Sequence, residues 1–313
     1  MLLDLPQPLR VARRPVSDGS TRGWHPSGEG SIHGSSGFGE RPDGELDAWH
    51  GLKCEVLACT GMHERRDYRL QESLLVLHQV GGSACIVTVG RGEQRYIVKS
   101  GAFDFFPAGT YRHVLVGPLP VRAIAVHVPA GFEYAVLEER GETGALPAQW
   151  QFSDRRLSRM VEGLAQVGER DKQSPDAVMR SVGIVDRLLD IRNGHSGSDG
   201  TGFSAVLSRL VAEYIDYRVP IGVKIDDLTS LMGLGRAQFA RGFREVFGMP
   251  LHGYLLTRRV ELAKAQLRGS RKVTQIAHEL GFASHAHFTT TFRKLAGMTP
   301  SAFRDSNRDP SSG

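Results

Sequence analysis

Residues 272–304 read KVTQIAHELGFASHAHFTTTFRKLAGMTPSAFR, and this stretch decides the fold of the C-terminal part of the chain. Val273 and Ile276 begin the i, i+3, i+4, i+7 spacing of an apolar helix face. Gly281 follows, where a helix end commonly needs a residue that tolerates positive φ. Ser284 is a candidate N-cap for a second helix. Two helices joined by a short turn with a glycine are typical of a helix-turn-helix unit, although ordinary helical cores contain the same corner.

The same pattern occurs a second time upstream, which favours a genuine repeat over chance. The offset between the copies is 48 residues in the first helix and the turn, and 49 residues in the second helix. The change therefore falls in the turn, where an inserted residue disturbs packing least. The upstream positions are Ile225, Leu228, Gly233, Leu234, Phe239, Phe243, Gly248 and Met249, and the downstream ones are Val273, Ile276, Gly281, Phe282, Phe288, Phe292, Gly297 and Met298.

Positive charge is concentrated in the part of the chain that carries the repeat. Residues 203–305 contain 15 Lys and Arg against 8 Asp and Glu, a net charge of +7, whereas the rest has 24 basic and 26 acidic residues. A basic surface is what contact with nucleic-acid phosphates requires, and a merely solvated basic face is the alternative. Because the charge coincides with two candidate recognition helices, we favour the functional interpretation.

Composition places the chain among intracellular globular proteins. Its 313 residues suffice for two domains. We find no apolar run of about 18 residues that would span a membrane, and no signal-peptide core. The cysteines, Cys54, Cys59 and Cys85, are odd in number and form no CxxC motif, which fits a reducing compartment. We therefore expect a cytoplasmic, nucleoid-associated protein without a cofactor.

Short apolar runs separated by Gly and Pro turns predict a small β-barrel or sandwich between about Leu52 and Val128. The expected strands cover residues 74–80, 84–89, 94–99, 102–106, 113–116 and 121–128. The spacing from Gly101 through Pro107 and Gly109 to His113 resembles the second motif of cupin barrels.

The other half of the cupin pattern is absent, because no His-x-His followed by Glu stands on an earlier strand. A metal needs three or four converging ligands, and only His78, His113 and His127 can be nominated, on separate strands. We therefore expect no metal. The three histidines remain candidates for lining a pocket that binds a small-molecule effector, or for ordinary structural roles.

Residues 150–192 have helical periodicity. Val178, Val182, Val185 and Leu189 form a seam that suits either a partner helix in a homodimer or the barrel of the same chain. A glycine-rich segment follows at residues 193–202. Further on, residues 250–268 predict one long helix of 19 residues, roughly 28 Å long at about 1.5 Å per residue. This length approaches the ~34 Å between successive major-groove faces, so the helix can separate two recognition helices by about one turn of DNA.

The C-terminal hundred residues resemble the DNA-binding domain of AraC/XylS-type bacterial transcription regulators, and the resemblance covers about a third of the chain. Its downstream signature consists of Ile276, Ala277, Gly281, Phe282, Ser284, Phe288, Phe292, Arg293, Gly297, Thr299, Pro300, Phe303 and Arg304. Its upstream part consists of Phe243, Phe247, Gly248, Met249, Pro250, Tyr254, Arg258 and Arg259. In this family a cupin-like barrel usually precedes the domain as its sensor.

The resemblance implies recognition helices at residues 236–247 and 285–295. The base-reading candidates are Arg236, Ala237, Gln238, Ala240 and Arg241 upstream, and His285, Ala286, Thr289 and Thr290 downstream. The phosphate candidates are Arg244, Arg258, Arg259, Lys272, Arg293 and Lys294. Two positions depart from the family: Thr290 stands where Arg is common, and Gly235 where Ser or Thr usually caps the helix. We therefore expect weaker base reading by the downstream helix.

These observations predict an α+β multidomain protein with an N-terminal cupin-like β-barrel and a C-terminal all-α domain of two helix-turn-helix units. The expected segments are a disordered arm (1–45), a sensor barrel (46–149), a helical linker or dimerisation segment (150–192), a flexible linker (193–202), the DNA-binding domain (203–305) and a disordered tail (306–313).

The expected function is that of an effector-responsive transcription regulator, with activation as the family tendency, and not an enzyme. The expected partners are double-stranded DNA, a small-molecule effector, RNA polymerase and a second copy of the chain. Two alternatives stay open: a cupin-type metal enzyme with an appended DNA-binding domain, and an architectural DNA-binding protein whose barrel senses nothing.

Overall fold

The computed structural model describes residues 50–59, 63–67, 69–82, 84–89, 92–116, 120–167, 171–195, 202–219 and 222–306. The predicted N-terminal arm lies outside the described residues, as do most of the predicted linker and tail. The strands are β1 (Lys53–Cys59), β2 (His63–Asp67), β3 (Ser73–Val80), β4 (Ala84–Val89), β5 (Gly92–Ile97), β6 (Phe103–Phe106), β7 (Arg112–Val116), β8 (Val121–Val128) and β9 (Gln149–Phe152). The helices are α1 (Ala130–Arg140), α2 (Arg155–Ala165), α3 (Pro175–Arg192), α4 (Ala205–Arg218), α5 (Ile225–Leu231), α6 (Arg236–Phe247), α7 (Leu251–Leu267), α8 (Val273–Glu279), α9 (His285–Ala296) and α10 (Pro300–Ser306).

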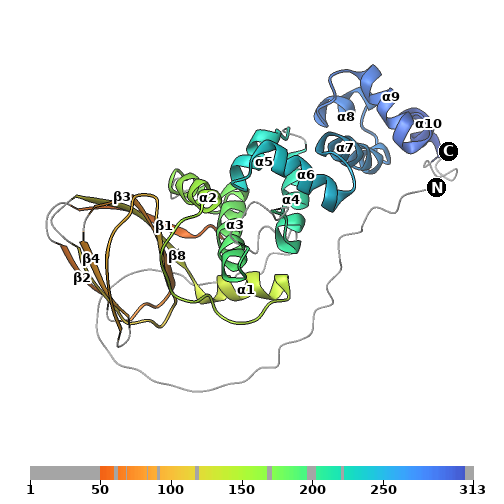
Figure 1. Cartoon of the computed structure of the whole chain (residues 1–313). Coiled ribbons are helices and arrows are strands. Elements are labelled where there is room, and N and C mark those ends of the chain that lie inside the picture. The colour runs from red at the N-terminus through yellow and green to blue at the C-terminus, as the bar shows by residue number, and fades with distance from the viewer. Residues whose placement is uncertain are drawn as a thin grey trace, which may run out of the picture.

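The elements are arranged as a row. The strands lie at one end, α1 to α6 fill the middle, and α7 to α10 lie at the far end (Figure 1). In the part of the chain that the structure describes, no helix is long and apolar enough to cross a membrane.

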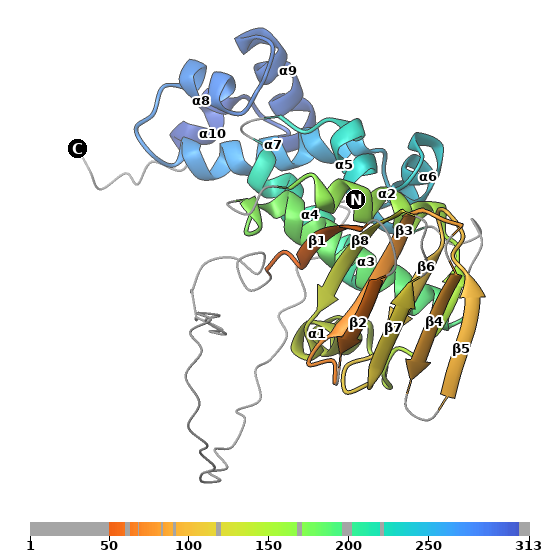
Figure 2. The ribbon, with the colours of Figure 1, turned by 90° about the vertical axis from the view of Figure 1, so that its left-hand side faces the viewer.

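The N-terminal strands form two antiparallel sheets. One has the order β1-β8-β3-β6-β9 and the other β2-β7-β4-β5, and the two lie face to face (Figure 2). All six predicted strands are present within two residues at each end, whereas β1, β2, β9 and α1 were not predicted. The observed sheets confirm the antiparallel β part of the predicted fold. A closed cupin barrel stays a prediction.

Alternation along β3 divides the apolar residues of the five-stranded sheet between two cores, because successive side chains of a strand point to opposite faces. Leu75 and Leu77 belong to the large core shared with the helices. Leu74 and Val76 belong to a smaller cluster, with Ala123 among its members, on the face toward the other sheet. The outward face therefore provides the platform for α2 and α3.

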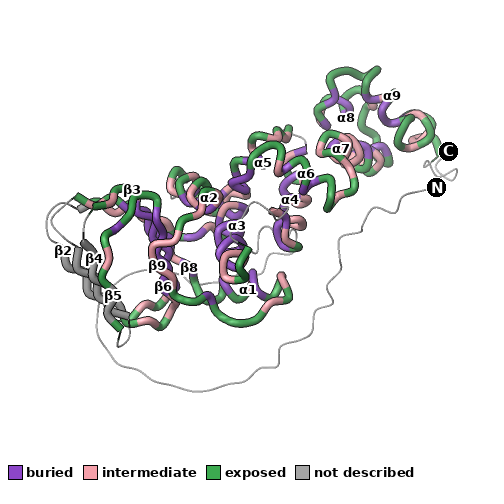
Figure 3. The backbone as a smooth tube through the Cα atoms, viewed as in Figure 1, coloured by how far each residue is buried: buried purple, intermediate pink, exposed green. Residues whose placement is uncertain are grey.

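The seam predicted on α3 is buried inside this chain. Val178, Val182, Val185 and Leu189 are at most 1% exposed and belong to the large core, and α3 appears buried along most of its length (Figure 3). The interpretation of this seam as a dimer surface is therefore wrong, because α2, α4 and the sheet-side residues already cover it.

The helical part of the chain is built on two apolar cores. The large core continues from the sheet through α2, α3 and α4 to Leu228 of α5 and Phe239 and Phe243 of α6. A separate core contains Val260 of α7 together with residues of α8 and α9, including Phe288. The upstream helix-turn-helix unit thus shares its core with the five-stranded sheet, whereas the downstream unit has its own. The predicted domain limits at 193–202 stay a prediction.

Candidate nucleic-acid interface

The upstream unit consists of α5, a tight turn and α6. Gly233 has a φ of +65° in this turn, and a Cβ there would lie 2.6 Å from the carbonyl oxygen of Arg156. Only glycine therefore fits, for its backbone angle and for its contact with α2. Gly235 occupies the N-cap of α6 and supplies no side-chain cap. This agrees with the predicted loss of a capping hydroxyl.

α6 separates an aromatic face from a polar one. Phe239 and Phe243 are fully buried, with ring centroids 5.6 Å apart. They anchor the helix, so the opposite face turns to solvent. Of the predicted upstream contacts, Gln238 is half-buried and the others are exposed: Arg236, Ala237, Ala240, Arg241 and Arg244. The predicted upstream residues therefore share one accessible face, and their contacts with bases stay a prediction.

Arg236 is held by an acidic residue of α5. Its Nε donates to Oδ1 of Asp226 at 2.6 Å, and its Nη2 donates to Oδ2 at 2.5 Å. Hydrogen bonding with the guanidinium of Arg236 lowers the pKa of Asp226, and hydrogen bonding with that carboxylate raises the pKa of Arg236. Sequence reasoning missed this partner, because no local helical spacing relates residues of two different helices.

The downstream unit, α8 and α9, repeats the geometry. Gly281 has a φ of +71°, and the hydroxyl of Ser284 accepts a hydrogen bond from the backbone N–H of His287 at 3.1 Å. The turn glycine and the N-cap predicted from the sequence are therefore both confirmed. Phe288 and Phe292 are fully buried, as their upstream equivalents are.

The polar face of α9 carries smaller side chains than that of α6. His285, Ala286, Thr290, Arg293 and Lys294 are exposed, whereas Thr289 is half-buried. The Thr289 hydroxyl oxygen is buried and has no hydrogen-bond partner among the described residues. Thr290, which stands where Arg is common in the resembled family, has a shorter side chain than arginine, and the weaker reading expected of this helix stays a prediction.

The predicted phosphate contacts fall into two groups. Arg244, Lys272, Arg293 and Lys294 are exposed. Arg258 is half-buried, and its Nε donates to Oδ1 of Asp216 at 2.6 Å, a hydrogen bond that raises the pKa of the guanidinium. Arg259 packs on the turn of the downstream unit, with its guanidinium carbon 5.7 Å from the ring centre of Phe282. Burial lowers the pKa of Arg259.

The three predicted pocket histidines do not form one cluster. His78 Nε2 lies 2.8 Å from Asp104 Oδ2, and His127 lies near two other carboxylates, 3.6 Å from Glu55 and 3.7 Å from Glu72. His113 belongs to β7, and its side chain lies outside what the structure describes. Among the described residues, no three of His, Cys, Asp and Glu are placed to hold a metal ion.

Asp104 is the centre of a polar cluster between the two sheets. It is 2% exposed and accepts hydrogen bonds from the Tyr96 hydroxyl at 2.6 Å and the Gln151 backbone N–H at 2.8 Å. Burial alone would raise the pKa of Asp104, but the hydrogen bonds with His78, Tyr96 and Gln151 outweigh it and lower the pKa. Because Tyr96 belongs to β5 and Asp104 to β6, the cluster ties one sheet to the other.

Three arginines of α2 and α3 grip the turn of the upstream unit. Arg156 Nε donates to the carbonyl of Met232 at 2.9 Å, and Arg159 Nη1 donates to that of Gly233 at 2.8 Å. Arg180 Nη1 donates to the carbonyl of Ser230 at 3.0 Å. We call Arg156, Arg159 and Arg180 the arginine clamp. It provides donors to the carbonyls of Met232 and Gly233, which follow α5, and adds a second donor to the Ser230 carbonyl, which also accepts the backbone N–H of Gly233.

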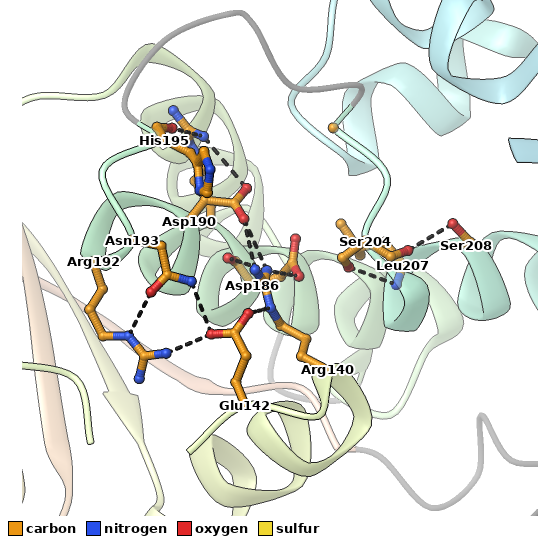
Figure 4. A network of polar contacts seen from close by, with 12 residues as sticks. Arg140, Glu142, Asp186, Asp190, Arg192, Asn193, His195, Ser204, Leu207 and Ser208 are labelled. Atoms are coloured by element: carbon orange, nitrogen blue, oxygen red, sulfur yellow. Dashed lines mark hydrogen bonds and ion pairs between the residues drawn. The ribbon is translucent and has the colours of Figure 1, made fainter. Parts of the chain in front are cut away.

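A second polar network joins the sheet side to the start of α4 (Figure 4). Arg140, the last residue of α1, donates to Asp186 at 2.6 Å and to Asp190 at 3.0 Å, both on α3. Asp186 is 1% exposed and is also hydrogen-bonded with Ser204, the N-cap of α4. The end of α1, the middle of α3 and the beginning of α4 are thus linked by polar contacts as well as by the core.

Comparison with known proteins agrees with this geometry. The family described as "Helix-turn-helix domain" matches residues 228–306, from α5 to α10. Probable transcriptional regulator LumQ of Photobacterium leiognathi is 31% identical over 96 residues, which are 30% of this chain and 39% of that protein. This match therefore concerns one part of each chain.

Two relatives match over a longer stretch. HTH-type transcriptional activator RhaS of Pectobacterium carotovorum is 27% identical over 228 residues, 68% of this chain and 79% of that protein. A putative AraC-like transcription regulator of Streptomyces antibioticus is 26% identical over 226 residues, 70% of this chain and 66% of that protein. Among solved structures, an AraC-type transcriptional regulator from Chromobacterium violaceum covers 32% of this chain and 90% of its own at 26% identity, with a TM-score of 0.30. Residues 228–306 therefore form a helix-turn-helix domain, and the chain is similar to AraC-type DNA-binding transcription regulators.

Proposed function

We propose that the chain is a sequence-specific transcription activator that inserts α6 and α9 into two adjacent major grooves and responds to a small-molecule effector. One observation carries the proposal: two helix-turn-helix units flank α7, and each exposes the polar face of its second helix. α7 contains 17 residues, which corresponds to roughly 25 Å at about 1.5 Å per residue. Activation is proposed because RhaS is named an activator.

The upstream helix carries most of the direct base reading in this proposal. Arg241 is exposed on α6, and an arginine can grip guanine O6 and N7 with two hydrogen bonds, worth about 1–3 kcal/mol of discrimination. On α9, the short side chains of Thr289 and Thr290 suit contact with a thymine methyl group or a phosphate. The two half-sites would therefore contribute unequally to specificity.

Phosphate contact is assigned first to the exposed cations Arg244, Lys272, Arg293 and Lys294. Arg258 ranks lower, because DNA would have to compete with Asp216 for its guanidinium or share it. Arg259 also ranks lower, because part of its side chain is buried against Phe282.

The effector would lie between the two sheets, in a barrel of cupin type. The inward face of the five-stranded sheet combines small apolar residues, Ala123 and Ala125, with the polar groups of His78 and Asp104. A ligand there would act on α2 and α3 through the large core. RNA polymerase and a second copy of the chain are proposed as further partners.

The arginine clamp would couple a structural change in the sheets to the orientation of α6, and thereby to DNA binding. α2 packs on the sheet-side core and, through Arg156 and Arg159, holds the turn before α6. A shift of α2 would therefore change the orientation of α6, whereas α9 stands on a separate core. Effector binding would then act as a population shift between arrangements of the two recognition helices.

The experiment is selection of bound genomic DNA fragments by the full chain, followed by fluorescence anisotropy titrations on the best site. We expect Arg241→Ala to weaken binding to that site by about 1–3 kcal/mol and to relax one base preference. Arg122→Ala removes the same charge from an exposed position on β8 and serves as the matched control. Equal losses by Arg241→Ala on selected and random DNA would contradict base reading by this residue.

A metal enzyme of cupin type is the alternative function. The two proposals differ in metal content, because an enzyme of this class needs a resident ion while the regulator does not. One tightly held iron or manganese per purified chain would favour the enzyme.

A further inference from the structure

We infer that Asp226 is a positioning residue for base recognition: it holds Arg236 by one edge of the guanidinium and leaves the other edge for a guanine. The inference rests on the proposed entry of α6 into the major groove. It assigns a specificity role to a residue of α5, the helix that would not itself read bases.

The contact uses a defined edge of the side chain. The Nε and Nη2 atoms of Arg236 each donate to one oxygen of Asp226, so two parallel hydrogen bonds fix the guanidinium plane. A guanidinium has five N–H donors in a rigid fork. No further hydrogen bond of Arg236 exists among the described residues, so the Nη1 donors and the second Nη2 donor remain. Those donors form the two-pronged edge that matches guanine O6 and N7.

The ion pair between Arg236 and Asp226 contributes little to the stability of the fold, because it lies on the surface. The side chains of Arg236 and Asp226 are 69% and 56% exposed, and exposed ion pairs contribute little to folding. What the pair does change is the freedom of a long side chain, which otherwise loses several rotamers on binding. Its main effect therefore falls on recognition, where the guanidinium arrives already oriented.

The position of Arg236 suits this role. It is the first residue of α6, and helix-turn-helix proteins contact base edges with the N-terminal residues of the recognition helix. Asp226 stands in the first turn of α5, in the other helix of the same unit. The pair thus spans the unit and fixes the side chain relative to both helices.

The downstream unit provides an internal comparison. At the repeat offsets of 48 and 49 residues, Thr274 and His285 occupy the positions of Asp226 and Arg236. Neither can form an arginine–carboxylate pair. The inference therefore applies to the upstream half-site alone and adds a second reason for unequal reading by the two units.

The test compares base preference rather than affinity, because removing a negative charge near DNA strengthens binding to any sequence. Dissociation constants are measured for the full chain on the selected site and on duplexes changed at each base pair of the α6 half-site. The variants are Arg236→Ala, Asp226→Asn and the double substitution. Asp227→Asn, which removes the same charge from the neighbouring residue, is the matched control, and thermal melting verifies that each variant is folded.

We expect Arg236→Ala to lose about tenfold preference for one G·C pair, the discrimination typical of a two-pronged arginine contact. Asp226→Asn should reduce the preference at that same pair by at least about threefold. The double variant should show no smaller preference than Arg236→Ala, because the effects of coupled residues do not add. Asp227→Asn should leave the preference unchanged.

Two outcomes would overturn the inference. In one, Asp226→Asn keeps the full preference at the pair that Arg236 reads. In the other, it strengthens binding to selected and random DNA alike with an unchanged preference, which would mean that Asp226 only withholds Arg236 from phosphates. A wild-type chain that selects no site would instead contradict the proposed function itself, so the two failures are distinguishable.

Discussion

Two glycines that play one role in the sequence pattern have different neighbours in the structure. Gly233 and Gly281 both have positive φ in the turn between two helices, at +65° and +71°. A Cβ on Gly233 would meet the backbone oxygen of Arg156 at 2.6 Å, whereas one on Gly281 would meet the end of the Arg259 side chain at 3.3 Å. Backbone cannot move aside as a side chain can, so identical substitutions at the two sites have different consequences.

We expect Gly281→Ala to cost roughly 1–2 kcal/mol of unfolding free energy, the strain of an L-residue in the left-handed region. Gly233→Ala should cost at least about 1 kcal/mol more, because overpacking against α2 is added to the same strain. Urea denaturation of the two variants measures the difference. Equal losses would show that α2 does not press on the upstream turn.

At the scale of the helix and the strand, an element could be predicted from the sequence where its own pattern of apolar residues was enough to define it. The periodicity of α5, α6, α8 and α9 was sufficient because their apolar faces are regular. β1 and β2 were missed: β2, HERRD, contains only polar residues, β1, KCEVLAC, carries charged residues at its first and third positions, and both join a sheet only through pairing with β8 and β7. Strand pairing is a non-local property, and a single sequence does not reveal it.

The candidate site was predictable to the same extent. Exposure of Arg236 and Arg241 follows from the helical period that buries Phe239 and Phe243. The ion pairs do not follow, because Arg258 reaches Asp216 across 42 positions of sequence. Partners of this kind depend on how helices cross, which the periodicity of each helix does not specify.

Asp104 ties four strands together, and its charge makes that link sensitive to acid. Because its pKa is lowered in the folded state, its stabilising contribution is fully present above the ordinary aspartate value of about 3.9. The contribution is lost as the pH falls through the lowered pKa of the folded protein.

We therefore expect Asp104→Asn to lose about 1.5–3 kcal/mol of stability at pH 7, the usual value of hydrogen bonds to a charged group. The same variant should lose less additional stability than wild type when the pH drops from 7 to about 3. Urea denaturation at both pH values gives the comparison. Parallel pH profiles for the two proteins would contradict the assignment of Asp104 as a charged link.

At the scale of the whole molecule, the two DNA-binding units differ in what they are attached to. The upstream unit shares the large core with the sheet and is held by the arginine clamp. The downstream unit is built on a separate core that begins at Val260. The mechanical link between them is α7, whose Leu255 still belongs to the large core.

Loss of the clamp should therefore loosen one unit and spare the other. In Arg159→Ala/Arg180→Ala, we expect amide hydrogen exchange of residues 228–234 to accelerate several-fold, because the carbonyls of Ser230 and Gly233 lose the arginine donors that tie this turn to α2 and α3. Exchange in α9 should stay unchanged. Arg155→Ala, an exposed arginine of the same helix, is the control, and equal acceleration in α9 would refute separate attachment.

The continuous core has a practical consequence for building chimaeric regulators. A graft that replaces everything after residue 202 with a foreign DNA-binding domain would remove α4 and α5, which both pack against α3, from the large core. The N-terminal part, with its two sheets and α1 to α3, would then expose an apolar surface and tend to aggregate. A splice within α7, after Leu255 and before Val260, keeps the buried residues of each core together, so new target specificity is best introduced by exchanging the downstream unit alone.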